Sequence, residues 1–594
     1  MKIRESYRKN WAPYIWAMPD IMAYQLISNS IFGVIYWLLR KAAMMLIKST
    51  GHVAISSGDF AFLFKTWQGP LLLIIALAIL FFHVATDINI QIAYAGRLLK
   101  GIQIKFIDLL RESFISIKNL FTPDGVLIII YIALIAPLCG LGLSISLTSS
   151  LYIPTFITSV IHANVYYNIL YFLLLAIFFF VGIINIFTLH GIVIEKLPSY
   201  KADNQSRQLV RNNWKDYLKQ NVSFILNIAV CNILLGIFTV FVPLIIAFFL
   251  KIDQSHNRML FIFICCIVMF FIYGFNSYVE SFYIIRLTQL FYRYKGDHEG
   301  FVYRRSTARV IVVMMFIILP IIISFGASFL ADKYFDELFY QEVSAKVIAH
   351  RGGGVEEIEN TIAGVEKAIE LKADGSEIDV QRTADGHYII NHDGNFARLC
   401  SNKRKPEELT LEEIKNLKIK DPNHPGKYGE VATIEEMLET VKGRIKLFIE
   451  LKGNSADRRM VDDLVAMIKE RDMMSDCVLI SLKYDLIDYC EKNYPEIDTA
   501  YLAFVSFGDT SKLNCDYLGL EEEASSSATI NNVHDQNKQF MVWTPNSTDG
   551  QRHFLLSPVD YIITDNIKQA KDLIEELNNR SDYELIIDAI ISLF

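Results

Sequence analysis

Long stretches of this 594-residue chain carry no charged side chain. The longest, Gly125–Ile194, holds 70 residues without Asp, Glu, Lys or Arg. A helix needs about 20 mostly apolar residues to cross the hydrocarbon core of a bilayer, so this stretch is long enough for two crossings joined at its polar middle. The chain therefore cannot fold as one water-soluble domain, and the sequence predicts a membrane protein.

Charge is distributed very unevenly along the chain. Residues 1–331 contain 27 Lys+Arg and 14 Asp+Glu, whereas residues 332–594 contain 30 and 50. The second part has the charge content of an ordinary soluble domain. We therefore expect a membrane domain at 1–331, in contact with the lipid bilayer, and a soluble domain at 340–594. The total of 57 basic against 64 acidic residues argues against a nucleic-acid partner, and the eight cysteines form no CxxC pair.

The uncharged stretches predict an α-helical transmembrane bundle of seven helices. They are expected near residues 21–47, 69–93, 125–148, 167–194, 222–250, 259–285 and 310–331. The first contains Arg40 and Lys41 near its end. A re-entrant or interfacial helix is the alternative there, and it would change the parity of the crossings.

Basic residues are concentrated in alternate connections between the expected helices. The N-terminus and the connections after the second, fourth and sixth helices are rich in Lys and Arg, whereas residues 149–168 contain none. Connections rich in Lys and Arg usually face the cytoplasm. The N-terminus is therefore expected in the cytoplasm and, after seven crossings of the plasma membrane, the soluble domain outside it. The first apolar run begins only after Asp20 and precedes no small-residue cleavage site, so no cleavable signal peptide is expected.

From Lys346 onward, short apolar runs alternate with amphipathic helical stretches. This alternation over about 250 residues predicts an α/β fold with a parallel sheet, and the length suits a (β/α)8 TIM barrel. There are nine such apolar runs but only eight strand positions in the barrel, so one run is not a barrel strand. The expected strands are Lys346–Ala349, Ser376–Val380, Tyr388–Asn391, Ile445–Leu451, Val478–Leu482, Thr499–Ala503, Tyr517–Leu520, Phe540–Thr544 and Tyr561–Thr564. The polar stretch near 395–429 does not fit the alternation and is interpreted as an insertion.

Ionisable residues recur where the expected strands end. They are His350, Arg351, Glu377, Asp379, His392, Glu450 and Lys452. The carboxyl ends of barrel strands converge on one face, where active sites form. Glu377 and Asp379 are two residues apart and so project from the same side of a strand. Together with Glu450 they make an oxygen-rich cluster, which favours one hard divalent cation, Mg²⁺ or Ca²⁺, over zinc.

Each of these features has an ordinary structural explanation when taken alone. A Glu-x-Asp pattern is usually a solvated strand face, a His-Asp pair a surface turn, and a tryptophan such as Trp543 part of the core. In this order, however, the motifs resemble the glycerophosphodiester phosphodiesterase family over about residues 345–570. The motifs are His350-Arg351-Gly352-Gly353, Glu359-Asn360-Thr361, Ala373–Val380, Thr383–Gly386, His392-Asp393, Glu450-Leu451-Lys452, Trp543–Asn546 and Val559–Asp565.

The resemblance implies a site and a reaction. The family consists of TIM barrels that use a divalent metal to split glycerophosphodiesters into glycerol 3-phosphate and an alcohol. Carried over by position, the implied metal ligands are Glu377, Asp379 and Glu450, and the implied general acid and base are His350 and His392. Arg351 and Lys452 would hold phosphate oxygens, Glu359 would brace the site or assist the metal, and Trp543 would contact the substrate.

The N-terminal half is similar in architecture to the membrane domain of a membrane-anchored subgroup of these enzymes. Together with the topology expected from the Lys and Arg distribution, the resemblance implies hydrolysis at the outer face of the plasma membrane. Lysophospholipid headgroups, poly(glycerol-phosphate) polymers such as teichoic acids, and soluble diesters are all open as substrates. The alternatives are lysophospholipase D-type or sphingomyelinase-like cleavage by a related barrel, and a non-catalytic sensor that only binds a phosphodiester.

Overall fold

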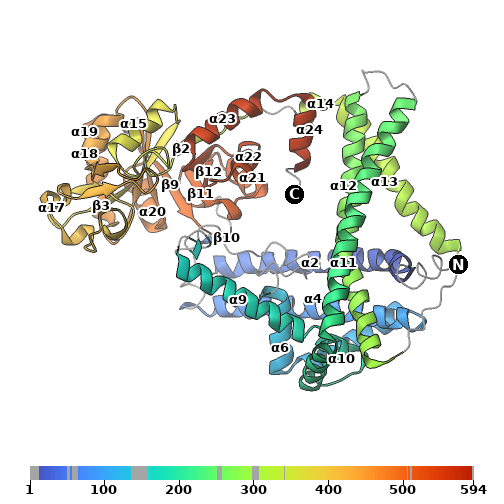
Figure 1. Cartoon of the computed structure of the whole chain (residues 1–594). Coiled ribbons are helices and arrows are strands. Elements are labelled where there is room, and N and C mark those ends of the chain that lie inside the picture. Colours follow the sequence, from blue (N-terminus) through green and yellow to red (C-terminus); the bar gives the residue numbers. More distant parts are fainter. Residues whose placement is uncertain are drawn as a thin grey trace. The chain divides into compact units, whose positions relative to one another are not determined.

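The computed structural model describes residues 12–49, 54–56, 65–135, 158, 161–162, 164–249, 257–297, 307–339, 342–504, 506–508 and 512–591. It forms two compact units (Figure 1). The first comprises Met1–Arg40 and Leu72–Leu338, and the second comprises Lys41–Leu71 and Phe339–Phe594. The segment Lys41–Leu71 thus groups with the soluble domain, although it lies between two helices of the membrane half in the sequence.

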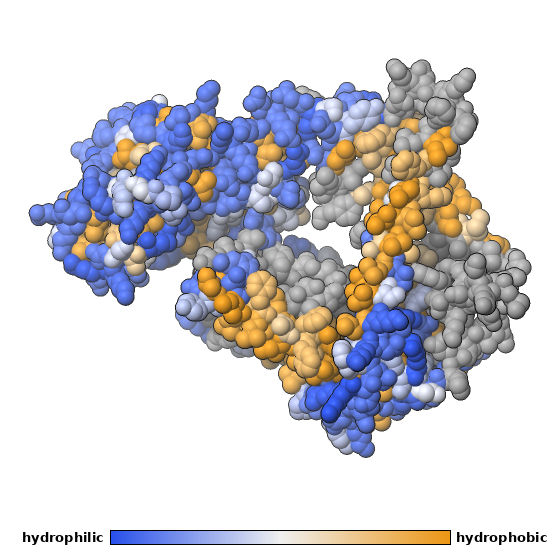
Figure 2. Space-filling model, in the orientation of Figure 1, coloured by the Kyte–Doolittle hydropathy of each residue, from blue (hydrophilic) through white to orange (hydrophobic). Residues whose placement is uncertain are grey.

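Long apolar helices make up the first unit. In order they are α2 (Ala12–Lys48), α4 (Gln68–Leu99), α5 (Phe106–Leu120), α6 (Pro123–Ile130), α9 (Val165–Ile184), α10 (Thr188–Ile194), α11 (Ser199–Phe249), α12 (Asn257–Lys295), α13 (Thr307–Lys333) and α14 (Phe335–Phe339). Within the described residues, five helical segments are long and apolar enough to cross a membrane, or six if the bent pair α5–α6 is one span. Figure 2 shows hydrophobic side chains along much of α9, α11 and α12 and a hydrophilic region around α10, whereas the surface of the soluble domain is mainly hydrophilic.

Six of the seven expected spans coincide with helices. They are α2, α4, α11, α12, α13 and the pair α9–α10, between which the expected span 167–194 is divided. The span expected near 125–148 starts in α6, and its part beyond residue 135 lies outside the described residues. Side-chain hydrogen bonds join α2 to α4 inside the bundle, because Tyr24 Oη donates to Asp87 Oδ1 at 2.8 Å and Tyr94 Oη to Asp20 Oδ2 at 2.8 Å.

Eight parallel strands close into a barrel in the second unit, which confirms the expected fold class. In spatial order they are β2 (Lys346–Ala349), β13 (Tyr561–Thr564), β12 (Gln539–Trp543), β11 (Tyr517–Glu521), β9 (Asp498–Ala503), β8 (Cys477–Ser481), β7 (Lys446–Leu451) and β3 (Gly375–Arg382). Pairing of β2 with β3 closes the ring. The extra run among the nine expected is β4 (Tyr388–Ile390), which pairs antiparallel with β3.

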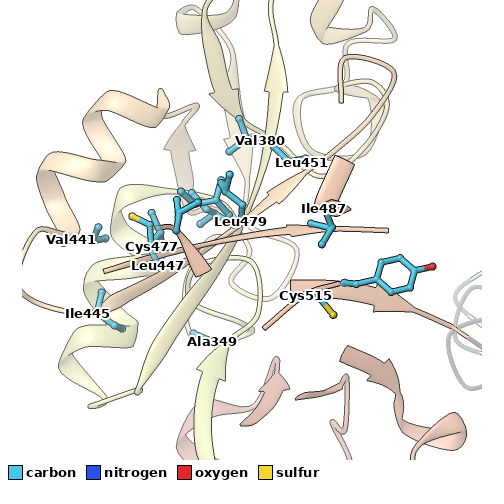
Figure 3. Close-up of a cluster of buried hydrophobic side chains, with 14 of the residues drawn as sticks. Ala349, Val380, Val441, Ile445, Leu447, Leu451, Cys477, Leu479, Ile487 and Cys515 are labelled. Carbon is cyan, nitrogen blue, oxygen red and sulfur yellow. The ribbon is translucent and has the colours of Figure 1, made fainter. Parts of the chain in front are cut away.

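Side chains of the strands build two apolar layers. One, inside the ring, consists of strand residues alone and includes Ile348, Phe448 and Met541. The other lies between the strands and the surrounding helices. Figure 3 shows side chains of this layer, among them Leu447 and Leu479 from strands and Ile487 from a helix. Alternating inward and outward side chains are what a strand buried on both faces requires.

Helices follow most of the strands. They are α15 (Ile362–Glu370), α18 (Ile434–Val441), α19 (Arg458–Glu470), α20 (Tyr484–Asn493), α21 (Ser527–His534), α22 (Thr548–Leu555), α23 (Ile567–Asn578) and α24 (Asp582–Ile591). Several begin at a side chain that accepts a backbone N–H of the first turn, as Thr361 does for α15 and Asp457 for α19. Such caps satisfy donors that have no partner within the helix.

The expected insertion is a small subdomain with its own core. It holds the short helices α16 (Ala397–Cys400) and α17 (Leu411–Lys415) and a hairpin of β5 (Lys418–Lys420) and β6 (Tyr428–Glu430). Phe396, Leu409 and Ile414 bury their side chains against Ile358, which precedes the first barrel helix. The insertion is therefore attached to the barrel by packing and not only by its chain ends.

A further strand pair lies outside the barrel ring. β10 (Ser506–Gly508) follows β9 and pairs antiparallel with β1 (Ala54–Ser56), which comes from the connection between α2 and α4. All seven cysteines in the described part of the chain are free, and Cys139 lies outside it.

Candidate active site

Three buried carboxylates from two neighbouring strands meet at the carboxyl ends of the barrel. Glu377 and Asp379 lie on β3, and Glu450 lies on β7 directly opposite Asp379 in the strand register. One oxygen from each residue lies within 4.8 Å of the other two. The two-residue spacing on one strand and the register with the next therefore bring together the predicted metal ligands.

The three carboxylates of this cluster are buried and repel one another. Burial and the Asp379 carboxylate raise the pKa of Glu377 to about 8, and burial also raises the pKa of Glu450. Glu377 Oε1 is buried and accepts no hydrogen bond from the described residues. Hard divalent cations take such carboxylate oxygens as ligands, so the three residues fit Mg²⁺ or Ca²⁺.

Lys452 supplies the nearest positive charge. Its Nζ lies 3.1 Å from Asp379 Oδ1 and 2.9 Å from Glu450 Oε2. Burial would raise the pKa of Asp379, but the Lys452 ammonium, together with His392, Arg351 and the hydrogen bond from Asn360, lowers it. Lys452 thus keeps part of the cluster ionised and points a cation into the mouth of the barrel.

His350 is paired with a carboxylate from the last barrel strand. It follows β2, and its Nδ1 lies 2.6 Å from Oδ1 of Asp565, which follows β13. Burial alone would lower the pKa of His350, but the Asp565 carboxylate outweighs burial and raises it. The same pairing lowers the pKa of Asp565 to about 2 against the effect of burial. The pairing with Asp565 therefore favours the protonated form of His350.

His392 is also paired with a carboxylate, but its other ring nitrogen contacts a cation. Its Nδ1 lies 2.9 Å from Asp393 Oδ1, and its Nε2 lies 3.0 Å from Nη2 of Arg351. Because a guanidinium can only donate, Nε2 is the accepting nitrogen and the proton is on Nδ1. The Nε2 lone pair of His392 therefore faces the Arg351 guanidinium inside the site.

Glu359 lies at the boundary between the barrel and the insertion. It receives Arg351 Nη1 at 3.4 Å and both Nη1 and Nη2 of Arg398 at 2.9 and 2.5 Å. Arg398 also donates to Asp393 through Nε at 2.8 Å. This one side chain of α16 therefore links the insertion to Glu359 and to the partner of His392.

The opposite side of the mouth is aromatic. Trp543 ends β12, and its ring packs edge-on against Phe504 with the centroids 4.8 Å apart. Phe504 directly follows β9. The mouth thus has charged groups at the ends of β2, β3 and β7 and the aromatic pair Phe504–Trp543 on its other side, where Glu521 of β11 lies opposite Trp543 in the strand register.

The structure brings together eight of the nine residues that the sequence analysis proposed, and the ninth, Trp543, lies at the carboxyl end of another barrel strand. Four further polar residues support them, namely Asn360, Asp393, Arg398 and Asp565. Asn360 receives the backbone N–H of Asp379 and donates Nδ2 to its Oδ2 at 2.8 Å. Three of the four belong to the motifs that carried the family resemblance, which gave them no role. Nothing in the local sequence around Arg398 identifies it.

Comparison with known proteins agrees with this geometry. Residues 350–569 match the glycerophosphoryl diester phosphodiesterase family, and residues 7–329 match the membrane domain of glycerophosphoryl diester phosphodiesterase. A glycerophosphodiester phosphodiesterase of Caldanaerobacter subterraneus is 27% identical over 247 residues, which are 39% of this chain and 98% of the relative. Human lysophospholipase D GDPD3 is 24% identical over 160 residues, 26% of this chain and 49% of the relative.

A solved glycerophosphodiester phosphodiesterase from Parabacteroides distasonis is also similar. It is 23% identical, covers 40% of this chain and 99% of its own, and gives a TM-score of 0.35.

A closed parallel barrel with acidic, basic and imidazole groups at the carboxyl ends of its strands has the arrangement of a TIM-barrel enzyme. The chain belongs to the glycerophosphodiester phosphodiesterase family, in the subgroup with a multi-helix membrane domain, and is an enzyme of that class.

Proposed function

We propose that the barrel hydrolyses glycerophosphodiesters with His350 as general acid and His392 as general base, assisted by one divalent cation. The observation that carries this assignment is the contrast between the two imidazoles. His350 Nδ1 lies against the Asp565 carboxylate, which favours the protonated imidazole, whereas His392 Nε2 accepts a hydrogen bond from Arg351. A proton donor and a proton acceptor at one mouth are what acid–base cleavage of an ester needs.

The groups around the imidazoles fit an anionic substrate. Arg351 and Lys452 hold the phosphate oxygens and stabilise the charge that grows on them. Glu377, Asp379 and Glu450 would hold the cation, which when bound polarises the phosphate. His392 Nε2 takes the proton from the glycerol hydroxyl beside the phosphate, and that oxygen attacks phosphorus to give a cyclic phosphate. His350 gives its proton to the departing alkoxide, and water then opens the ring to glycerol 3-phosphate.

The outer face of the plasma membrane is the proposed location. The distribution of Lys and Arg among the connections supports it. Pairing of β1 with β10 supports it too, because it requires the connection between α2 and α4 to lie on the same side of the membrane as the barrel. Tyr428→Cys, at an exposed position of the insertion, should react with a membrane-impermeant maleimide in intact cells, with the unsubstituted protein as control. Labelling only after lysis would contradict this location.

The reaction is tested with the full-length protein in lipid nanodiscs. Release of glycerol 3-phosphate is measured from glycerophosphocholine and glycerophosphoglycerol with Mg²⁺, Ca²⁺ or a chelator. His350→Ala and His392→Ala should each lower kcat by about 10²–10⁴-fold, the usual contribution of a positioned acid or base. The matched control is His534→Ala, since His534 also pairs with an aspartate, Asp560 at 2.7 Å, but lies outside the site. Absence of release from every diester would favour the sensor alternative.

Lysophospholipase D-type cleavage is the second candidate. Its support is the similarity to human lysophospholipase D GDPD3 together with the aromatic side of the mouth formed by Phe504 and Trp543. A panel of diesters with and without a free glycerol hydroxyl beside the phosphate separates the two. The main proposal requires that hydroxyl, so cleavage of diesters that lack it would favour the second candidate.

A further inference from the structure

A strand from the membrane half of the sequence is built into the catalytic unit. β1 lies between α2 and α4 in the chain, yet it pairs antiparallel with β10, with Ala54 opposite Gly508, Ile55 opposite Phe507 and Ser56 opposite Ser506. The compact unit that contains the barrel accordingly includes Lys41–Leu71. The strand pair therefore joins this connection to the barrel by backbone hydrogen bonds.

The partner strand β10 lies at the aromatic side of the mouth. β9 ends at Ala503, Phe504 packs on Trp543, and β10 begins two residues later at Ser506. Two residues span at most about 7 Å, and neighbouring strands lie about 5 Å apart. Ser56, opposite Ser506, is therefore within about 12 Å of Phe504 along this path.

The chain from β1 to the nearest membrane helix is short. α2 ends at Lys48, six residues before Ala54. Six residues reach at most about 20 Å. As long as β1 stays paired with β10, the mouth cannot move farther than this tether allows from the end of an apolar helix that is long enough to cross the membrane.

We propose that docking of β1 on β10 holds the mouth of the barrel at the membrane surface and thereby selects phosphodiesters whose alcohol carries an acyl chain. This inference rests on the proposed function of the barrel. An acyl chain stays in the bilayer, so the phosphate of such a diester rises only a short way above the surface. A mouth held by β1 meets it at a higher effective concentration than a mouth held only by the chain that leads from α14 into β2. A soluble diester reaches the mouth from any direction and gains nothing from the tether.

Docking itself is tested by a disulfide. Cα atoms of residues directly opposite in an antiparallel pair lie about 4.5–5.5 Å apart, within the range that a disulfide spans. In the full-length protein, Ile55→Cys/Phe507→Cys should cross-link under mild oxidation, as detected by mass spectrometry of the linked peptides. Ile55→Cys/Tyr428→Cys, with the second cysteine in the insertion, is the control and should not. No link in the first pair, or equal links in both, would overturn the docking.

Selection is tested with two substrates that differ by one acyl chain. Full-length protein in phosphatidylcholine vesicles is given lysophosphatidylglycerol in the bilayer or glycerophosphoglycerol in solution, and release of free glycerol phosphate, counting both the 1- and the 3-phosphate, is measured. Ile55→Pro and Ser56→Pro each remove a backbone donor from β1, and alternate residues donate in such a pair, so one of the two breaks the ladder. That variant should lower the ratio of lipid to soluble turnover at least tenfold, whereas Ile55→Val should leave the ratio unchanged.

The outcomes separate the two proposals. Retained turnover of glycerophosphoglycerol in the proline variants shows that the barrel is folded, and an unchanged ratio in both variants overturns the selection. If the unsubstituted protein releases glycerol phosphate from neither substrate, the proposed function fails and the selection with it. In that case the disulfide experiment still tests whether β1 pairs with β10.

Discussion

His350 Nδ1 lies 2.6 Å from Asp565 Oδ1, which joins the first strand of the barrel to the last one at the catalytic mouth. The pairing raises the pKa of His350 despite burial and lowers that of Asp565 to about 2. Asn546 Nδ2 donates to the other oxygen of Asp565 at 2.6 Å and fixes its orientation. The carboxylate therefore has an electrostatic effect that substitution can measure.

Asp565→Asn should move the alkaline limb of the pH profile to lower pH. A group with a raised pKa stays protonated until the pH rises through that value, and activity that needs the proton is lost there. Removing the carboxylate takes away the opposite charge that raises the pKa of His350, so the limb moves toward lower pH. The measurement is kcat/KM against pH for the full-length enzyme.

The matched control for this substitution is Asp560→Asn. Asp560 pairs with His534 at 2.7 Å in the same domain, but that pair lies outside the mouth. The control should retain the wild-type pH profile. An alkaline limb that stays in place in Asp565→Asn would show that His350 is not the group whose protonation the reaction needs.

Binding of a divalent cation should weaken as the pH falls below 8. Without a cation, burial and Asp379 raise the pKa of Glu377 to about 8, so a proton competes with the cation for this carboxylate. Competition by one proton raises the apparent Kd about tenfold per pH unit. Isothermal titration with Mg²⁺ and Ca²⁺ at pH 6, 7 and 8 measures it, in protein freed of metal by a chelator.

Two variants test whether Glu377 causes this pH dependence of cation binding. Glu377→Gln should bind the cation more weakly and lose most of the pH dependence, because the competing proton site is gone. Glu522→Gln, in the other acidic cluster of the barrel, should behave as the wild type. Equal apparent Kd values at pH 6 and pH 8 in the wild type would mean that Glu377 is not a ligand.

Arg398→Lys should lower kcat/KM about tenfold with little loss of stability. Arg398 holds both oxygens of Glu359 and also contacts Asp393, a geometry that a planar guanidinium provides and an ammonium does not. Its side chain is 41% exposed, so its contribution to stability is screened by solvent. Arg404→Lys, at another arginine of the insertion, paired with Glu413 at 3.0 Å, is the control. Equal kcat/KM in both variants would leave Arg398 without a role in positioning the site.

The sequence predicted those parts of the molecule that depend on local pattern. Alternating apolar runs located all eight barrel strands, and β2 and β13 begin and end at the expected residues. The spacing correctly predicted that Glu377 and Asp379 lie together, because side chains two residues apart project from the same side of a strand. The roles of β4 and of α21, α22 and α24 were not predicted, since their short or weakly periodic sequences do not distinguish a barrel element from a connection.

Contacts across long separations in the sequence could not be predicted. Arg398 reaches Glu359 across 39 residues, and its part in the site depends on how the insertion packs against Ile358. Pairing of Ile55 with Phe507 joins segments about 450 residues apart. Neither leaves a signal in a single sequence, because hydrogen bonds between strands involve the backbone and an ion pair requires only residue types that are common everywhere.

Gly354→Ala should destabilise the barrel far more than the same change at Gly443. Both glycines have a left-handed backbone, with φ +61° and +66°, so both substitutions carry the strain of about 1 kcal/mol that an L side chain meets there. A Cβ at Gly443 meets no atom within 4 Å, whereas at Gly354 it would lie 2.0 Å from the backbone oxygen of Asp565. The turn after β2 must therefore move away from Asp565, the residue that orients His350. Thermal unfolding should show a lower Tm for Gly354→Ala together with lost activity, and a Tm equal to that of Gly443→Ala would contradict the close approach.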